Sequence, residues 1–238
     1  GYYTGYDNTL GSNNVFIGYH SGRKNSSGES NIFIGTEAGW GNISGTSNIF
    51  LGYNAGFAST SSYNVFIGHE SGKENLTGTR NAFIGYQTGY NNISGSRNVI
   101  IGDLAGTSNQ SGHENVFIGK DAGSSNIGGS FNIYIGYQAA MKATTPNSNT
   151  IIGHKAGTET TTGFYNTIIG YAAGLNTTEG SYNTFVGMSA GQGNISGQYN
   201  TFLGMNSGLN NNGSKNVFIG MNAGWNSDKS DWLMIQNF

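Results

Sequence analysis

The 238-residue chain has no cysteine, a single proline and only 9% charged residues. The absence of cysteine excludes disulfide bridges, thiolate metal sites and cysteine nucleophiles. No apolar run approaches the roughly 18 residues of a membrane span, so we expect no membrane insertion. The formal net charge of −2 provides no basic patch for phosphate contacts, and we expect no nucleic-acid partner.

Glycine and aromatic residues are abundant, with 41 Gly, 13 Phe, 14 Tyr and 3 Trp. The glycine fraction is too low, and proline too rare, for a collagen triple helix. A disordered chain would need few aromatic residues and a high net charge. The composition therefore favours a folded protein whose polarity comes from Asn, Ser, Thr and Gly.

A repeat of 17 residues runs along the chain. An aliphatic residue followed by glycine recurs thirteen times, from Gly18 to Gly220, at intervals of 17 residues with two intervals of 16. We call these the strand-end glycines. An asparagine stands four residues before each of them, and these pre-strand asparagines are Asn14, Asn31, Asn48, Asn64, Asn81, Asn98, Asn115, Asn132, Asn149, Asn166, Asn183, Asn200 and Asn216.

The period predicts the fold. Seventeen residues are too few for two packed helices with their turns, whereas an apolar segment of three or four β-branched and aromatic residues is typical of a short strand. We therefore predict an all-β fold, a β-solenoid of about 13–14 coils, each coil being one 17-residue winding. We expect one repeat domain over residues 1–229, starting within a coil, and a degenerate final coil over 230–238 that acts as a cap or a junction.

The strand segments are apolar on both faces. In the first of them Phe16 points to one side while Val15 and Ile17 point to the other. A solenoid made of one chain covers only its inner face, and an apolar stripe on the outside marks an interface. We therefore expect a homo-oligomer of chains lying side by side, with threefold symmetry the most natural arrangement for a fibre.

Two structural roles are open for the pre-strand asparagines. They can form an amide ladder in which each side chain bonds to the next coil, or each can occupy a corner in the left-handed backbone region. The strand-end glycines, and a second glycine four residues after most of them, indicate corners or close chain approach, because glycine adopts positive φ freely.

These repeats resemble a known family. Residues 14–22, 48–56 and 183–191 follow the pattern Asn-x-Phe-Ile-Gly-x-x-Ala-Gly with small variations, which is similar to the repeats of bacteriophage tail-fibre proteins and to head repeats of trimeric autotransporter adhesins. The resemblance implies a trimeric, left-handed parallel β-roll that is displayed outside the cell and used for attachment.

No catalytic constellation is apparent. The four histidines fall at three different repeat positions, so no pair is close enough to share a metal ion. Asp103 and Asp121 are the best pair of carboxylates, but their positions in the coil differ and we expect them not to converge. We therefore expect no enzyme activity, no catalytic residue, no cofactor and no metal site.

Aromatic residues recur at two further repeat positions. Rows of rings with interleaved asparagine could bind glycans by stacking and hydrogen bonding; the alternatives are self-packing of the rings or burial between chains. The residues after the second glycine are Trp40, Phe57, Tyr90 and Trp225. The residues before the asparagine are Tyr165, Tyr182 and Tyr199.

The triplet Asn-x-Ser/Thr also recurs, mostly at one repeat position. It is either an N-glycosylation acceptor or simply an Asn/Ser/Gly turn. The asparagines concerned are Asn25, Asn42, Asn75, Asn92, Asn109, Asn176, Asn194 and Asn212.

These observations favour a structural and attachment segment of an extracellular trimeric fibre, located on a virion tail or a cell surface, with a cell-surface glycan or receptor as partner. One alternative is an ice-binding solenoid, because Thr150, Thr167, Thr184 and Thr201 align over four consecutive coils. A self-polymerising extracellular filament is another, since coils without caps expose free strand edges.

Overall fold

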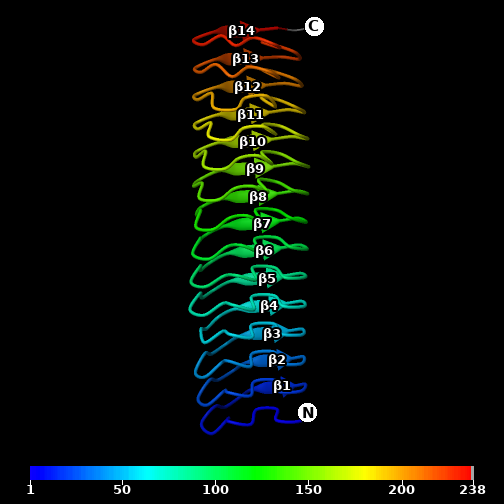
Figure 1. Ribbon diagram of the computed structural model, residues 1–238, viewed down its shortest axis with the longest axis vertical. Coiled ribbons are helices and arrows are strands. Elements are labelled where there is room, and N and C mark those ends of the chain that lie inside the picture. Colours follow the sequence, from blue (N-terminus) through cyan, green and yellow to red (C-terminus); the bar gives the residue numbers. More distant parts are fainter. Residues whose placement is uncertain (237–238) are drawn as a thin grey trace. The chain divides into compact units, whose positions relative to one another are not determined.

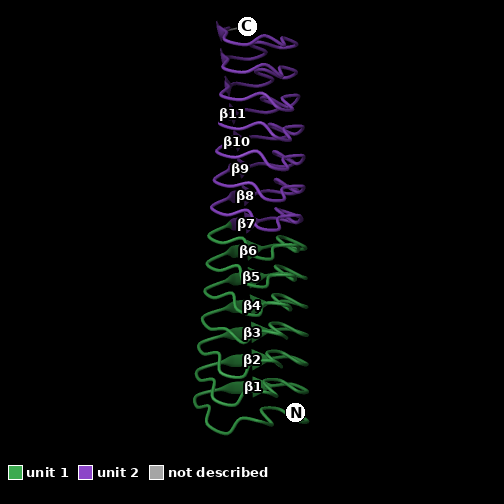
Figure 2. Ribbon diagram, turned by 60° about the vertical axis from the view of Figure 1, so that its left-hand side comes forward, with its two compact units in different colours: residues 1–115 green, residues 116–238 purple. Residues whose placement is uncertain are grey.

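The computed structural model describes residues 1–236, which belong to two compact units, one formed by residues 1–115 and the other beginning at residue 116 (Figure 2). Each unit is a parallel β-solenoid built on the 17-residue period. The chain has about 13 coils, and the described residues contain no helix. The predicted all-β solenoid is thus confirmed.

Each strand has three residues, and within each unit successive strands pair in parallel and in register (Figure 1). The first unit contains β1 (Val15–Ile17), β2 (Ile32–Ile34), β3 (Ile49–Leu51), β4 (Val65–Ile67), β5 (Ala82–Ile84) and β6 (Val99–Ile101). The second unit contains β7 (Val116–Ile118), β8 (Ile133–Ile135), β9 (Thr150–Ile152), β10 (Thr167–Ile169), β11 (Thr184–Val186), β12 (Thr201–Leu203), β13 (Val217–Ile219) and β14 (Leu233–Ile235).

The central residue of each strand fills the core. Phe33, Phe50 and Phe66 are fully buried, and their rings stack with centroids 4.8 and 4.9 Å apart and nearly parallel planes. A column of small residues, which includes Ala38 and Ala55, is fully buried as well. Burying a side chain of this size stabilises by about 1.5–3 kcal/mol, so the repeated aromatic column is a main source of stability.

The two glycine positions are required by geometry. Gly35 has a φ of 135°, and a Cβ atom there would overlap the carbonyl oxygen of Gly52 in the following coil. Gly39 has a φ of 60°, and a Cβ atom there would run into the ring of Phe33. Both φ values disfavour residues with a side chain. The glycines therefore occupy corners and close approaches, as the sequence predicts.

The pre-strand asparagines bond from coil to coil. Asn48 donates its backbone N–H and its Nδ2 to Oδ1 of Asn31, at 3.0 and 3.1 Å, and its Nδ2 also donates to the Ser61 carbonyl at 2.8 Å. Its own Oδ1 accepts the backbone N–H of Asn64 at 2.9 Å. The left-handed backbone lies one residue earlier, where Ser47 has a φ of 57°. Of the two roles considered, these contacts are those of an amide ladder.

Candidate functional site

The outward residues of the strands form an exposed aliphatic face in each unit. We define this aliphatic face as the first and third residues of the strands, which are Val, Ile, Leu or Ala except in β9 to β12, where the first residue is Thr. Ile34 in the first unit is 38% exposed, and Leu203 in the second is 46% exposed. Just beyond the strand-end glycines, tyrosine and methionine side chains such as Tyr53 and Met205 are exposed as well. Each unit therefore presents repeated apolar side chains to solvent.

Histidine is sandwiched between tyrosines once in each unit. In the first unit, the His69 ring lies 5.0 Å from Tyr53 and 5.3 Å from Tyr86. In the second unit, His154 stacks at 5.1 Å on both Tyr137 and Tyr171. The faces of both imidazoles are thus covered by neighbouring rings, which is a packing role.

The aromatic residues after the second glycine are partly self-packed. Trp40 and Phe57 stack with centroids 5.0 Å apart and an interplanar angle of 3°. Lys24 Nζ lies 3.8 Å from the Trp40 ring centroid, so the faces of this indole are covered. Tyr90 accepts a hydrogen bond from Lys73 Nζ at 3.2 Å. In the first unit, this row offers ring edges, and little free ring face, to a ligand.

A charged cluster lies beside this row. Lys73 Nζ donates to Glu70 Oε1 at 2.7 Å, and Gln87 Nε2 donates to Glu70 Oε2 at 2.7 Å. The hydrogen bond from Lys73 is the main cause that holds the pKa of Glu70 below its ordinary value. The same bond raises the pKa of Lys73 above its ordinary value. Glu70 and Lys73 therefore form an ion pair, and both carboxylate oxygens of Glu70 accept hydrogen bonds within the protein.

The tyrosines before the pre-strand asparagines form a second row. Tyr165 and Tyr182 stack at 5.3 Å, and Tyr182 and Tyr199 stack at 4.9 Å. All three are exposed and have positive φ values. The aligned threonines lie close by in sequence, as the first residues of four successively paired strands, β9 to β12.

A second asparagine ladder was missed by the sequence reasoning. Asn42 is fully buried and donates its Nδ2 to Oδ1 of Asn25 at 2.7 Å and to the Gly45 carbonyl at 3.1 Å. Asn92 donates to Asn75 in the same way. We call these residues the turn asparagines. The sequence feature that could have indicated this ladder is the recurrence of Asn-x-Ser/Thr at one repeat position. The same recurrence is equally consistent with a surface turn.

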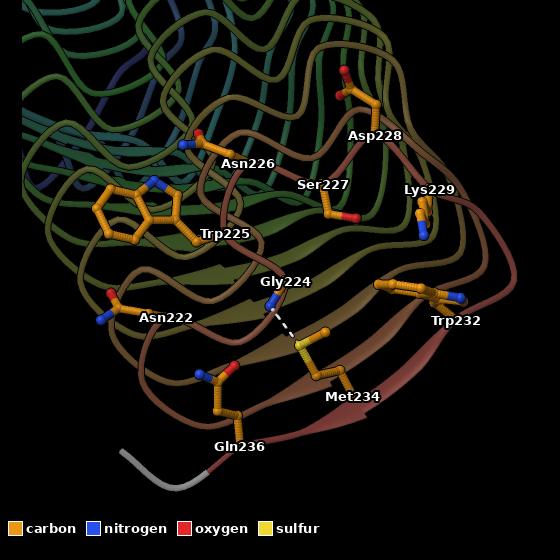
Figure 3. Close-up of a pocket in the computed structure, with 10 residues that line it drawn as sticks. All are labelled: Asn222, Gly224, Trp225, Asn226, Ser227, Asp228, Lys229, Trp232, Met234 and Gln236. Carbon is orange, nitrogen blue, oxygen red and sulfur yellow. Dashed lines mark hydrogen bonds between the residues drawn. The ribbon is translucent and has the colours of Figure 1, made fainter.

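A pocket of about 480 Å³ lies at the final coils of the second unit (Figure 3). Trp225 stands at one side of it and Trp232 at the other, with Met234 between them in the view of Figure 3. Asn226 and Gln236 contribute polar groups from the loop and from the end of β14. Trp225 belongs to the second unit, whereas the other three aromatic residues of its repeat position belong to the first.

Comparisons with protein-family models, with curated proteins and with solved structures found no match to this chain. No helix capable of spanning a membrane occurs in residues 1–236. Within the same residues, no three His, Asp or Glu side chains are grouped so that they could hold a metal ion.

Proposed function

We propose that this chain is a structural and attachment segment of an extracellular fibre, a trimer of left-handed β-rolls that pack side by side through their aliphatic faces. The observation that carries the proposal is the repeated exposure of aliphatic side chains, such as Ile34 and Leu203, on the outside of each unit. The resemblance of the repeats to phage tail fibres and adhesin heads supports a place on a virion tail or a cell surface.

Association follows from the energetics of the aliphatic face. Soluble monomers rarely expose contiguous apolar patches larger than a few hundred Å², and parallel strands that are apolar on both faces are normally covered on both. Each aliphatic side chain that becomes fully buried contributes about 1.5–3 kcal/mol. Cyclic symmetry buries the aliphatic face of every chain in the same way. In a ring of three chains, no aliphatic face is left exposed to solvent.

Attachment is supported by the polar and aromatic surface. The exposed Tyr165, Tyr182 and Tyr199 offer ring edges and hydroxyl groups to a cell-surface partner. Tyrosine combines apolar area with a hydrogen-bonding tip, which suits recognition surfaces. Low charge favours contacts made through such neutral groups over contacts made by ion pairing.

The oligomeric state is the first test. Light scattering coupled to size exclusion is expected to give three times the chain mass of 25.1 kDa. Ile34→Lys places a charge on the aliphatic face and is expected to lower the mass toward that of one chain. Ile43→Lys, at an exposed turn position, is the matched control and should leave the mass unchanged. A wild-type chain that stays monomeric and folded contradicts the trimer.

The attachment half is tested with labelled protein on intact cells. Binding that saturates and is competed by unlabelled protein is expected for at least one cell type in a panel of bacteria. Tyr182→Ala, at the centre of the tyrosine row, should weaken this binding while circular dichroism stays unchanged. Absence of binding to every member of the panel contradicts attachment and leaves only a spacer.

A further inference from the structure

The ladder of turn asparagines is interrupted inside the second unit. Asn126 occupies the turn position before β8, and Asn194 occupies it before β12. In the three coils between them, the same position is held by Ala143, Thr160 and Thr177. All five side chains are fully buried. Neither alanine nor threonine carries an amide, so the amide-to-amide bonds stop for three consecutive coils.

The core residues of the same coils differ as well. β8 carries Tyr134 and β9 carries Ile151 where most strands have phenylalanine. In a phenylalanine coil, a Cβ atom at the second glycine would meet the ring, as at Gly39. At Gly157, in the β9 coil, it would meet two carbons of Ile151 and the hydroxyl oxygen of Thr160. The threonine hydroxyl therefore lies beside the core residue, and the β10 coil repeats this arrangement.

Four side chains in these successive coils have a buried polar atom without a partner. None of the four atoms forms a hydrogen bond within residues 1–236. They are the phenol oxygen of Tyr134, the hydroxyl oxygens of Thr160 and Thr177, and Oδ1 of Asn194. We call these four side chains the buried polar column. Because buried polar groups are nearly always hydrogen-bonded, the column indicates a partner that the chain does not supply.

Tyr134 lies at the first coil of this column. Its ring stacks on Phe117 with centroids 4.8 Å apart and an interplanar angle of 4°, so the phenol oxygen extends beyond the end of the aromatic column. Burial raises the pKa of Tyr134, and the Asn149 amide in the following coil acts in the opposite direction. That amide donates to the Gly163 carbonyl at 2.8 Å and is not placed to form a hydrogen bond with the phenol.

The spacing of the coils matches bridging by water. Successive coils are about 4.8 Å apart, which is too far for the hydroxyls of Thr160 and Thr177 to bond directly if they follow the coil spacing. Two hydrogen bonds of about 2.8 Å that meet at a tetrahedral angle span about 4.6 Å. One water molecule between adjacent coils can therefore bond to both hydroxyls.

The chemistry and the size of the region also favour water. A water molecule both donates and accepts hydrogen bonds, as two hydroxyls and an amide oxygen require, and buried waters make about three such bonds. The column contains no residue that is charged at neutral pH, which favours a neutral ligand over an ion. Ala143 is smaller than asparagine and Ile151 is smaller than phenylalanine, so these coils have room that the phenylalanine coils lack.

From these observations we propose that the second unit contains a buried hydration site, in which the buried polar column holds ordered water molecules. The waters join successive coils where the side-chain amides of the turn position are missing. The inference does not depend on the proposed function, because it concerns only the interior of the second unit.

A crystal structure of the whole chain, at a resolution that shows ordered water, is the direct test. At least one water is expected at about 2.7–3.2 Å from two atoms of the buried polar column. The inference is overturned if the region contains no water, or if the hydroxyls bond directly to backbone carbonyls.

The sign of a stability change is an independent test. Thr160→Val and Thr177→Val each replace a hydroxyl by a methyl group of similar shape. Removing a buried hydroxyl that had no partner would stabilise the fold, whereas removing one that binds water leaves the water with an unmet bond. We expect each variant to unfold at a lower denaturant concentration than wild type, measured at one protein concentration. An unchanged or higher midpoint for both variants overturns the inference.

Thr162→Val is the matched control. It makes the same substitution at an exposed position two residues from Thr160 and should leave the unfolding midpoint unchanged. If it lowers the midpoint as much as the buried substitutions do, the loss comes from the change to valine itself and the hydration site is rejected.

A double variant tests whether water stands in for the missing amide. Tyr134→Phe/Ala143→Asn restores the residue types of the phenylalanine coils. Its crystal structure is expected to show the introduced amide in place of the water nearest the former phenol, with water retained between Thr160 and Thr177. Water that stays beside the introduced amide would contradict the replacement of amide by water.

Discussion

At the residue scale, asparagine links successive coils through side-chain amides. Asn48 uses both ends of its amide, donating to Asn31 and Ser61 and accepting from Asn64. It is fully buried, so every one of these bonds is made away from water. An unmet buried polar group costs about 1–3 kcal/mol, which explains why both ends of the amide are matched in each coil.

Asn48→Asp is therefore expected to destabilise more than Asn48→Ala. The aspartate loses the donor to Asn31 and Ser61 and places a carboxylate next to their oxygens, whereas alanine leaves only unmet partners, at about 1–3 kcal/mol. Denaturant unfolding measures both. Asn176→Ala, at an exposed position, should change stability by less than about 0.5 kcal/mol. Equal stabilities of the two Asn48 variants would contradict the amide ladder as a source of stability.

The Glu70–Lys73 pair predicts a dependence on pH. Because the pKa of Glu70 is lowered in the fold, chiefly by its bond from Lys73, its contribution is present above the ordinary carboxyl pKa and is lost as pH falls through the lowered value. The pKa of Lys73 is raised, so its contribution is present below its ordinary pKa of 10.5 and is lost as pH rises through the raised value.

Glu70→Gln removes the carboxylate and keeps the side-chain length. Wild type should be more stable than this variant at neutral pH, and the difference should shrink under acid conditions that protonate Glu70. Unfolding measured at a series of pH values gives the difference directly. Glu29→Gln, at an exposed position, is the control. A difference that is constant from neutral to acid pH would show that the pair does not contribute through its charge.

At the element scale, the strand and the turn after it depend on different residues. Three apolar residues such as Ile32, Phe33 and Ile34 make the strand, and the glycine that follows permits the chain to leave it. Gly35 combines a φ of 135° with close approach of the next coil. Neither condition can be met by a residue with a side chain unless the coils separate.

Gly35→Ala is expected to destabilise the fold by at least about 1–3 kcal/mol, whereas the same change at a position with a compatible backbone stabilises by about 0.4–1 kcal/mol. The added methyl group meets the carbonyl of Gly52 in the neighbouring coil. Thermal unfolding followed by circular dichroism measures the loss. Thr36→Ala, one residue later, is the control and should have a small effect. A fully stable Gly35→Ala protein would mean that the coil spacing adjusts easily.

The strands and glycine corners were predictable because each depends on residues adjacent in the repeat. The 17-residue spacing was enough to predict the position of every strand. This includes β14, although its sequence Leu233–Ile235 has no phenylalanine. The turn asparagines were different, because Asn42 reads as a surface turn or a glycosylation acceptor. Only the stacking of coils reveals that its amide points inward to Asn25.

The candidate site was less predictable than the fold. Trp225 shares a repeat position with Trp40, so the sequence groups the two, but their surroundings differ completely. Trp40 is covered by Lys24 and Phe57, whereas Trp225 is at the pocket with Trp232. Trp40 has a coil on either side, whereas Trp225 lies in the last coil that the structure describes, and a repeat position by itself does not specify this difference.

At the scale of the whole molecule, the turn asparagines limit chemical modification. Asn25, Asn42, Asn75, Asn92, Asn109 and Asn194 are fully buried, whereas Asn176 and Asn212 are exposed. An enzyme that attaches glycans needs access to the side-chain amide. The folded chain therefore offers only the two exposed asparagines of this set as acceptors.

Expression in a glycosylating host tests this. Peptide mapping is expected to find glycans on Asn176 and Asn212 only, and the double variant Asn176→Gln/Asn212→Gln should have the mass of the bare polypeptide. Asn42→Gln, which removes a buried acceptor triplet, should not change the number of attached glycans. A glycan on Asn42 in folded protein would contradict the buried ladder.

The amide ladders have a consequence for how such a chain diversifies. The pre-strand asparagines recur in every coil up to Asn216, and their bonds run between inward-facing groups, so these bonds do not depend on the side chains at outward positions. Ile43, Leu76 and Gln110 occupy one such outward position in different coils. Mutations can therefore replace outward-facing residues one at a time, and duplication can add whole repeats. In both cases the bonds between the pre-strand asparagines of successive coils are retained.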